Sequence, residues 1–347
     1  MDDIARLPAS DRAGLFGTAS ARRGDMRPAL IEKDFWVCWT LQRIFTLDAP
    51  PAGLVFKGGT SLSKVFHAID RFSEDVDLSF DRSAFGFGGD NDPAKAPSGK
   101  QTAKRLKKLS AACREMIRTA FLPRLEASFG EALGTAPSGK TWGVELDPDD
   151  PDEQTLTFRY PAGLAHGENA QARYLRPVVR LELGARGEQW PAEWAVIKSY
   201  AAQAIPAPFK NPSCRVKVLA AGRTFWEKAT ILHMLYHLPS GKRLPERHSR
   251  HYYDLVKLYG KEAGKKASAD LELLKDVVKH KSVFFSSAAA RYDLAAPGTL
   301  KLAPPPGRRK ELEDDYAKMR EMIFGPAPGW RDIIRELQQL EDKINRR

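Results

Sequence analysis

The feature that most constrains this chain is a Gly-Gly turn at residues 57–64, with the sequence Lys-Gly-Gly-Thr-Ser-Leu-Ser-Lys. The short apolar run before it, at 53–57, is typical of a buried strand, and the apolar spacing after it predicts a helix. Glycines allow close approach of a ligand to the backbone, and free N–H groups at a helix start favour an anion. The order strand, Gly-Gly, helix therefore predicts a phosphate cradle formed by Gly58, Gly59 and Ser61.

Two carboxylates, Asp75 and Asp77, follow the turn at short spacing. In a strand, residues i and i+2 point to the same face, so both side chains project one way while Val76 and Leu78 project into a core. Neighbouring like charges are costly unless a cation lies between them, and Mg²⁺ prefers carboxylate and phosphate oxygens. The pair predicts a metal-dependent nucleotidyltransferase with two Mg²⁺ ions, which activate the attacking hydroxyl and stabilise the leaving pyrophosphate. A solvated acidic strand end is the alternative.

Residues 57–64 and 71–78 together resemble the AbiEii/AbiGii toxin family of nucleotidyltransferases, and residues 32–37 resemble the leading helix of that family. Its members are the toxin halves of bacterial toxin–antitoxin and phage abortive-infection systems. The resemblance is specific over residues 30–80 and looser downstream. It implies an NTP substrate, tRNA as the acceptor, growth arrest relieved by a separately encoded antitoxin, and nucleotide binding by the motif's last residue, Lys64.

Three further residues complete the site that we expect. Glu182 alternates with Arg180 along a predicted strand and is our candidate for a third carboxylate, as metal ligand or as base; an exposed polar strand edge is the alternative. Lys228 resembles the family's phosphate-binding lysine, and a point cation suits a triphosphate; neighbouring charges in solvent are the alternative. Asp254 lies in a segment that resembles the family's final acidic element, with His251 in place of the first aspartate. Asp254 either orients Lys228 or an arginine, or lies on a helix surface.

The pattern of elements predicts an α/β (α+β) fold, a nucleotidyltransferase-type mixed sheet flanked by helices. A helix is expected over 28–46, another over 60–69, and a long one from about 101 to 133 with a kink at Pro123. Strands are expected at 142–146, 155–160, 178–183 and 194–200. From residue 223 the chain is expected to be mostly helical. At 347 residues the chain is long enough for two lobes, which we place at 1–200 and 201–347.

Composition favours a polyanionic partner. The net charge is +11, and basic residues cluster at 100–108 and 242–250, which suits binding of RNA by counterion release, although solubility alone also explains a basic surface. The absence of a 20-residue apolar run and of an apolar N-terminal segment argues against a membrane span and a signal peptide. Three scattered cysteines (Cys38, Cys113 and Cys214) fit a reducing cytoplasm.

Three other interpretations compete with the transferase. Residues 134–141 match the P-loop pattern of an NTPase, but the expected helix before them and strand after them reverse the order that a P-loop requires. His233 and His237 have zinc-ligand spacing without the glutamate of a metalloprotease, and a packed helix face with two histidines is the interpretation that we prefer to a zinc site. A nucleic-acid-binding module without catalysis is the third, and the paired aspartates argue against it, because negative charge beside a phosphate site weakens RNA binding.

Overall fold

The computed structural model describes residues 1–48, 53–134, 141–164 and 176–346. These residues form a mixed α/β fold, as predicted, with a seven-stranded sheet. The chain divides into two compact units, each made of several segments. Unit 1 comprises Met1–Val65, Ser73–Asp92 and Ala103–Val218, and unit 2 comprises Phe66–Phe72, Pro93–Thr102 and Leu219–Arg347. The division after residue 200 stays a prediction.

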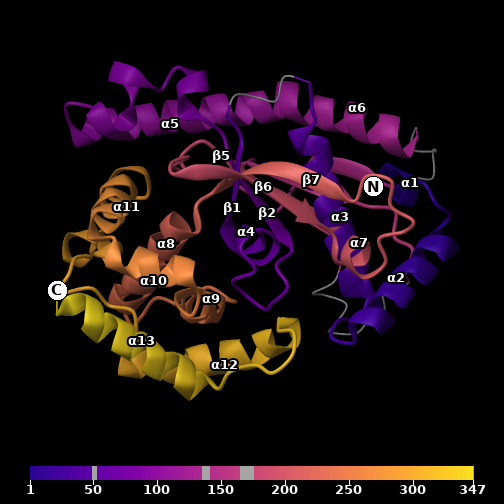
Figure 1. Cartoon of the computed structure of the whole chain (residues 1–347). Coiled ribbons are helices and arrows are strands. Elements are labelled where there is room, and N and C mark those ends of the chain that lie inside the picture. Colours follow the sequence, from indigo (N-terminus) through magenta and orange to yellow (C-terminus); the bar gives the residue numbers. More distant parts are fainter. Residues whose placement is uncertain (49–52, 135–140, 165–175, 347) are drawn as a thin grey trace. The chain divides into compact units, whose positions relative to one another are not determined.

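The sheet belongs to unit 1 and has the strand order β3-β4-β5-β2-β1-β7-β6. Strands β1, β2, β5, β6 and β7 are labelled in Figure 1. β2 lies between β1, to which it is antiparallel, and β5, to which it is parallel. β1 also pairs with β7 in parallel. The strands are β1 (Val55–Lys57), β2 (Asp75–Ser79), β3 (Gly143–Leu146), β4 (Thr155–Arg159), β5 (Val178–Gly184), β6 (Ala192–Lys198) and β7 (Ser213–Leu219). All but β7 were expected from the sequence, within two residues at each end.

One face of the sheet is covered by helices that carry aromatic side chains. Helix α3 (Pro28–Phe45) contributes Trp36 and Trp39, and helix α6 (Leu122–Leu133) contributes Phe129. Phe129 lies 4.7 Å from Phe158 of β4 between ring centroids, and Trp36 stacks on Tyr160 at 5.4 Å. Each fully buried side chain of this size contributes about 1.5–3 kcal/mol. The aromatic layer therefore anchors this face and leaves the chemistry to the other one.

Two helical expectations are confirmed and one is wrong in part. Helix α3 matches the expected 28–46. The long helix is present as α5 (Gly99–Met116), a π-helical turn (Ile117–Phe121) and α6, so its irregularity lies just before Pro123, which cannot supply an N–H to a regular helix. The helix expected over 60–69 is only α4 (Gly58–Lys64). Beyond it the chain enters unit 2, where the Phe72 N–H donates to the Met322 carbonyl at 2.7 Å.

Unit 2 is built mainly of helices, as expected. Helix α8 packs against α9, α10 and α11. The helices of this part are α8 (Ala221–His237), α9 (Ser249–Tyr259), α10 (Glu262–Ala269), α11 (Leu271–Phe284), α12 (Arg309–Met319) and α13 (Trp330–Asn345). Unit 1 additionally contains α1 (Asp2–Ala5), α2 (Ala9–Arg23) and α7 (Tyr200–Ala204). Among the described helices, none combines the length and the apolar character that a membrane span requires.

Candidate active site

Three carboxylates lie side by side on the sheet face opposite the aromatic layer. Asp75 and Asp77 alternate along β2 with the buried Val76 and Leu78. Asp77 is paired across the β2–β5 ladder with Glu182. Because directly paired residues of neighbouring strands point to the same face, the side chains of Asp75, Asp77 and Glu182 share that face. We call these three residues the carboxylate row.

The Gly-Gly turn is packed directly against the carboxylate row. Gly58 has φ +79°, and a Cβ built at this position would lie 1.9 Å from Oδ2 of Asp77, which is far inside van der Waals contact. The Thr60 hydroxyl donates to the backbone carbonyl of Asp75, and the Ser61 hydroxyl donates to the carbonyl of Gly58 at 2.8 Å. Only glycine combines this backbone conformation with this close approach. The turn and the acidic strand therefore form one local structure.

We expect Gly58→Ala to reduce nucleotidyl transfer about 10²-fold, because the added methyl group must displace the Asp77 carboxylate, and small misplacements of reacting groups are costly. The left-handed backbone alone costs a non-glycine residue about 1–2 kcal/mol. Gly86→Ala provides the matched control, since Gly86 has φ +77° and open space around it. Transfer rates and urea unfolding of both variants separate the two effects. Equal transfer rates in the two variants would contradict the proposed contact.

Lys64, expected to bind nucleotide, is placed in the interior of unit 1. Its ammonium group lies 2.7 Å from Oδ1 of Asp34 and 3.6 Å from the ring centroid of Tyr200. Burial disfavours the charged form, but the neighbouring Asp34 outweighs it and raises the pKa of Lys64. A cation held in this way is already neutralised. Nucleotide binding by Lys64 stays a prediction, and the contacts favour a role in anchoring the end of α4.

Helix α3 holds both sides of the motif through consecutive buried charges. Lys33 pairs with Glu74 at 2.5 Å, immediately before the carboxylate row. Asp34 pairs with Lys64 at the end of α4 and also accepts from the Tyr200 N–H at 2.6 Å. Loss of one partner of such a buried ion pair destabilises the folded protein, because the other charge is left buried without a counter-charge. The sequence signal for these residues is three successive charges, starting at Glu32, in a helix whose apolar residues point to burial on all sides.

Arg180 is a cation beside the carboxylate row that we did not assign to the site from the sequence. It is paired with Asp75 across the β2–β5 ladder and forms an ion pair with Asp147 at 2.9 Å. Its burial opposes the charge, but the carboxylates of Asp75, Asp147 and Glu182 together raise the pKa of Arg180. Arg180 therefore places a permanent positive charge beside the Asp75 end of the carboxylate row. This charge partly offsets the repulsion among the three carboxylates.

Unit 2 contains the other two predicted site residues in one buried network. Both oxygens of Asp254 accept from Arg71, at 2.6 and 2.7 Å, and Oδ2 also accepts from Lys228 at 2.7 Å. Burial opposes the charge on Asp254, but the two cations hold its pKa below the usual range. Burial lowers the pKa of Lys228. The alternative of a helix-surface acid is excluded for Asp254, which is fully buried, and Arg71 is a partner that sequence reasoning missed.

His251, which replaces the aspartate of the family element, lies in the same region of unit 2. Burial and the positive charges of Lys228 and Arg250 lower its pKa well below the ordinary value. The imidazole is therefore neutral at pH 7. A neutral side chain cannot take over the electrostatic role of an aspartate. Of the two acidic positions of the family motif, only Asp254 therefore carries a negative charge in this protein.

The carboxylate row contains oxygen ligands of the kind that bind Mg²⁺. Within the described ranges, no group of three or more His, Cys, Asp or Glu residues is arranged to hold a metal ion. Mg²⁺ does not require such a cage, because it commonly binds through one or two carboxylates together with phosphate oxygens of a substrate. Asp75 and Asp77 supply that donor set, on the interior strand β2, which the glycine turn closely approaches. The residues present fit a magnesium ion that binds together with a nucleotide.

The zinc alternative is not supported by the histidine contacts. His233 Nδ1 accepts from the Lys301 N–H, and Nε2 lies 3.0 Å from the carbonyl of Arg291. Both ring nitrogens are therefore engaged by the backbone. His237 stacks edge-on against His233 with ring centroids 4.6 Å apart, which is the packed helix face that competes with a zinc site.

The P-loop alternative falls largely outside the described residues, which end at 134 and resume at 141. The flanking elements are described, however. Helix α6 ends at Leu133 and strand β3 begins at Gly143. A P-loop joins a preceding strand to a following helix, and this order is the reverse.

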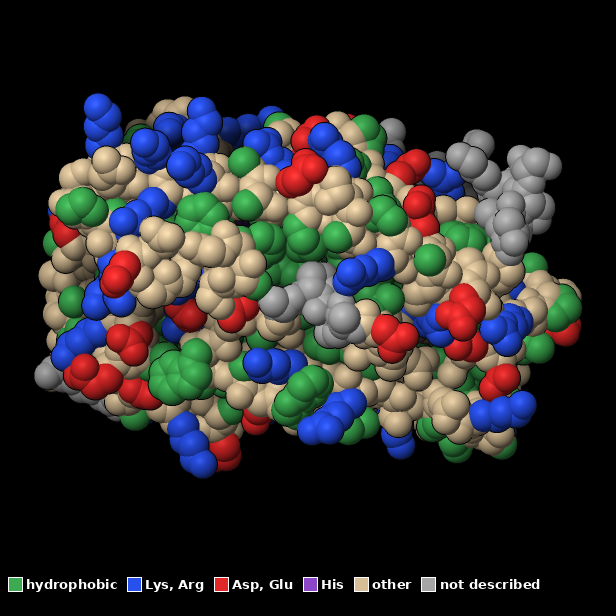
Figure 2. Space-filling view, turned by 90° about the horizontal axis from the view of Figure 1, so that it is seen from above, with side chains coloured by type: hydrophobic (Ala, Val, Ile, Leu, Met, Phe, Trp, Pro, Cys, Tyr) green, Lys and Arg blue, Asp and Glu red, His purple; other side chains and the backbone are tan. Residues whose placement is uncertain are grey.

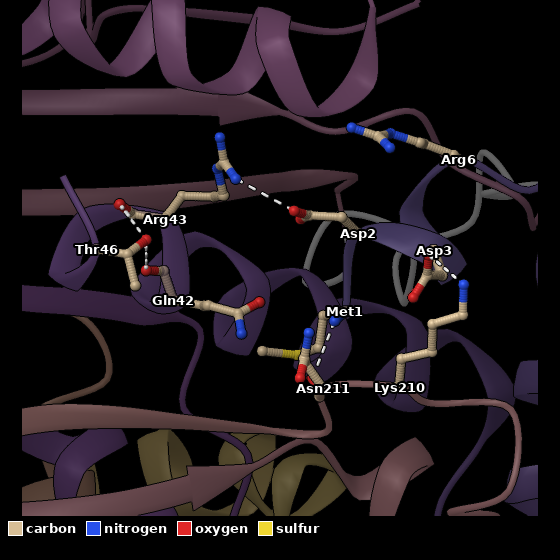
Figure 3. Close-up of a pocket in the computed structure, with 9 residues that line it drawn as sticks. All are labelled: Met1, Asp2, Asp3, Arg6, Gln42, Arg43, Thr46, Lys210 and Asn211. Atoms are coloured by element: carbon tan, nitrogen blue, oxygen red, sulfur yellow. Dashed lines mark hydrogen bonds and ion pairs between the residues drawn. The ribbon is translucent and has the colours of Figure 1, made fainter.

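A pocket of about 400 Å³ lies elsewhere in unit 1 (Figure 3). It is lined by α1, the end of α3 and Lys210 with Asn211. Arg43 reaches across it to Asp2 at 3.2 Å, and the Met1 amino group donates to the Asn211 carbonyl at 2.9 Å. None of the predicted site residues lines this pocket, so we assign it no part in nucleotidyl transfer.

The mixed sheet, the carboxylate row and the glycine turn packed on it define the class of this protein as a nucleotidyltransferase. The family model for the nucleotidyl transferase AbiEii toxin of type IV toxin–antitoxin systems matches residues 39–336. This is most of the chain, so the protein belongs to that family and is a nucleotidyltransferase toxin. The resemblance found in the sequence is thereby confirmed.

A solved toxin structure shares this fold. The chain is similar to MenT4, a nucleotidyltransferase toxin from Mycobacterium tuberculosis H37Rv, with a TM-score of 0.50 and 16% sequence identity over 95% of this chain and 88% of that one. A weaker similarity connects it to JHP933 from Helicobacter pylori, with a TM-score of 0.42 and 14% identity over 92% and 93% of the two chains. No curated protein matches the sequence.

Proposed function

We propose that this toxin transfers a nucleoside monophosphate from an NTP to the 3′ hydroxyl of tRNA, with Mg²⁺ as the metal. The observation that carries the proposal is the packing of Gly58 on Asp77, which brings the glycine turn into direct contact with one of the paired carboxylates. A cradle without acids would bind phosphate only. Acids without a cradle would bind metal only. Their combination serves phosphoryl chemistry, in which charge stabilisation and positioning supply most of the catalysis.

The residues of unit 1 have distinct roles in this proposal. Asp75 and Asp77 would hold Mg²⁺, in a two-metal site, which would supply charge neutralisation and a more acidic acceptor hydroxyl. Gly58, Gly59 and Ser61 would hold the triphosphate. Glu182 would accept the proton of the acceptor hydroxyl. We prefer this role to metal ligation because, among the described residues, no three His, Cys, Asp or Glu side chains are arranged to hold one metal ion.

The roles of the unit 2 residues follow the family resemblance. Lys228 would neutralise phosphate charge, and Asp254 would orient it through the 2.7 Å contact between Nζ and Oδ2. Burial opposes the charge on Lys228, and the Asp254 carboxylate favours it, so the lysine depends on that partner for its charged form. Asp254 is thus proposed as a positioning residue rather than one that touches substrate.

The acceptor and the partner are inferred from charge and from the family. Lys and Arg side chains gather at the upper left of the face shown in Figure 2. The exposed lysines of α5 are Lys100, Lys104, Lys107 and Lys108. Such a surface suits RNA, whose affinity comes largely from phosphate contacts. Membership in a type IV toxin–antitoxin family supports a separately encoded antitoxin that relieves growth arrest, and a cytoplasmic site of action.

The experiment that tests the proposal incubates the protein with total RNA and each labelled NTP in turn, with Mg²⁺ or with EDTA. We expect label on tRNA-sized RNA with at least one NTP, and loss of label with EDTA or in Asp75→Ala. No transfer with any NTP, or equal transfer by Asp75→Ala, would overturn the proposal. Label on another RNA would support nucleotidyl transfer but contradict tRNA as the acceptor. Full loss of turnover in Lys140→Ala together with normal turnover in Asp75→Ala would favour the P-loop alternative.

A further inference from the structure

The sheet face of the carboxylate row continues through β1 onto β7. Lys57 of β1 is paired with Asp77 of β2, so both point to that face. β7 is in register with β1 at Val218 and Phe56, which lie on the opposite, buried face. Because side chains alternate along a strand, the other positions of β7, which include Arg215 and Lys217, return to the face of the carboxylates.

The same face ends on the edge strand β6 with an exposed aromatic residue. The guanidinium of Arg215 lies 4.7 Å from the ring centroid of Trp194, so Trp194 shares the face of Arg215. Trp194 is 56% exposed, and Val196, two residues further on the strand, is 63% exposed. Lys198 continues this alternation at the end of β6. Trp194 and Val196 are therefore neighbouring exposed apolar side chains on one face of the strand, and contiguous exposed apolar surface of this kind marks interaction sites.

We propose that Trp194 and Arg215 form a platform that binds a single-stranded segment of the acceptor nucleic acid, a proposal that rests on the transferase function and adds the location of its acceptor. Proteins that bind single strands combine aromatic rings, on which bases stack, with cations that follow the backbone. Both components are present on β6 and β7. They lie on the sheet face that also carries the carboxylate row.

Charge complementarity favours a nucleic acid over a protein as the occupant. The cations that share this face beyond β2 are Lys57, Lys198, Arg215 and Lys217. A polyanion neutralises all four, and its bases supply a stacking partner for the indole. An apolar protein surface would cover the indole and leave the cations to be desolvated, which is unfavourable.

The first arm of the test measures base stacking. The full-length protein, carrying Asp77→Asn to prevent turnover, is titrated into a labelled single-stranded RNA oligonucleotide and followed by fluorescence anisotropy. We expect Trp194→Ala to weaken the Kd about 5- to 100-fold and Trp194→Phe to restore most of it, because a phenyl ring also stacks. Phe285→Ala is the matched control, since Phe285 is an exposed aromatic residue of unit 2 at 45% exposure, and should bind like the parent.

The second arm measures the phosphate contact through its salt dependence. Arg215→Ala should reduce the slope of log K against log salt by about 0.7, the value for one single-strand phosphate contact, whereas Trp194→Ala should leave the slope unchanged. Arg335→Ala, which removes an exposed arginine from α13, should change neither. Circular dichroism of each variant verifies that the fold is retained.

The outcomes separate this inference from the proposed function. Unchanged RNA affinity and slope in both Trp194→Ala and Arg215→Ala would overturn the platform and leave the surface to a protein partner such as the antitoxin. If the parent enzyme transfers no nucleotide to any RNA, but the two variants lose affinity as described, the proposed function fails and the binding platform stands. Transfer to RNA with the same KM for RNA in Trp194→Ala would support the function and overturn the platform.

Discussion

Asp77→Asn is expected to lower the rate of nucleotidyl transfer by roughly 10³-fold, since it removes a metal-binding charge while keeping the side-chain shape that packs on Gly58. The free energy of unfolding should change by less than about 0.5 kcal/mol or increase, because one like charge of the carboxylate row is removed. Single-turnover transfer assays and urea unfolding measure the two quantities on the same preparation. The combination of a large kinetic loss and no loss of stability distinguishes a catalytic charge from a structural one.

Glu145→Gln is the matched control for this variant. Glu145 lies on β3 of the same sheet, is exposed, and pairs with Arg159 at 2.8 Å. The Glu145→Gln substitution removes one carboxylate from the sheet and leaves the three residues of the carboxylate row unchanged. Transfer by Asp77→Asn at the control rate, or a loss of stability of several kcal/mol, would contradict the assignment of Asp77 as a metal ligand.

Asp254→Asn is expected to destabilise the folded protein by about 3–5 kcal/mol at pH 7, because it leaves two buried cations, Arg71 and Lys228, without their anion. The effect depends on pH with a defined sign. The folded pKa of Asp254 lies below its unfolded value of about 3.9, so its contribution is complete above that pH and is lost as the pH falls through the folded pKa. The difference in unfolding free energy between parent and variant should therefore be full at pH 7 and shrink below about pH 4.

Denaturant unfolding at pH 7, 5 and 3.5 checks this expectation, with Asp276→Asn as the control. Asp276 is an exposed acid of α11 in the same unit and should change stability by less than about 0.5 kcal/mol. A loss for Asp254→Asn that is the same at all three pH values would show that packing rather than charge is responsible. A loss no greater than the control would contradict the network itself.

Much of the fold follows from local patterns in the sequence. Strands β4 and β5 bury side chains on one face only, so apolar and polar residues alternate along them. Strands of this kind can be predicted from the sequence. β7 was missed because the charged residues Arg215 and Lys217 interrupt its apolar residues and make a seven-residue strand appear polar. The end of α4 was misplaced because apolar spacing continues to Ile69, while the chain leaves the helix at Val65 to join unit 2.

The candidate site was predictable where its geometry is local. The shared face of Asp75 and Asp77 follows from a spacing of two in a strand. The pairing of Asp77 with Glu182 depends on strand register, which no local pattern supplies, so alternation could nominate Glu182 but not locate it. Arg71 and Asp254 are 183 residues apart in sequence. Their ion pair exists only because tertiary folding brings them together, and nothing near Arg71 indicates it.

The segment Phe66–Phe72 has a consequence for any attempt to dissect this protein. It joins the glycine turn to the acidic strand, yet it belongs to unit 2, where Arg71 is held by Asp254 and Phe72 by the Met322 carbonyl. A fragment that stops at residue 218 keeps the sheet except for the last residue of β7, Leu219, but loses both anchors of that connection. The boundary between the units therefore does not provide a cutting point, and split or truncated forms of this toxin must be designed around the loop rather than at the end of β7.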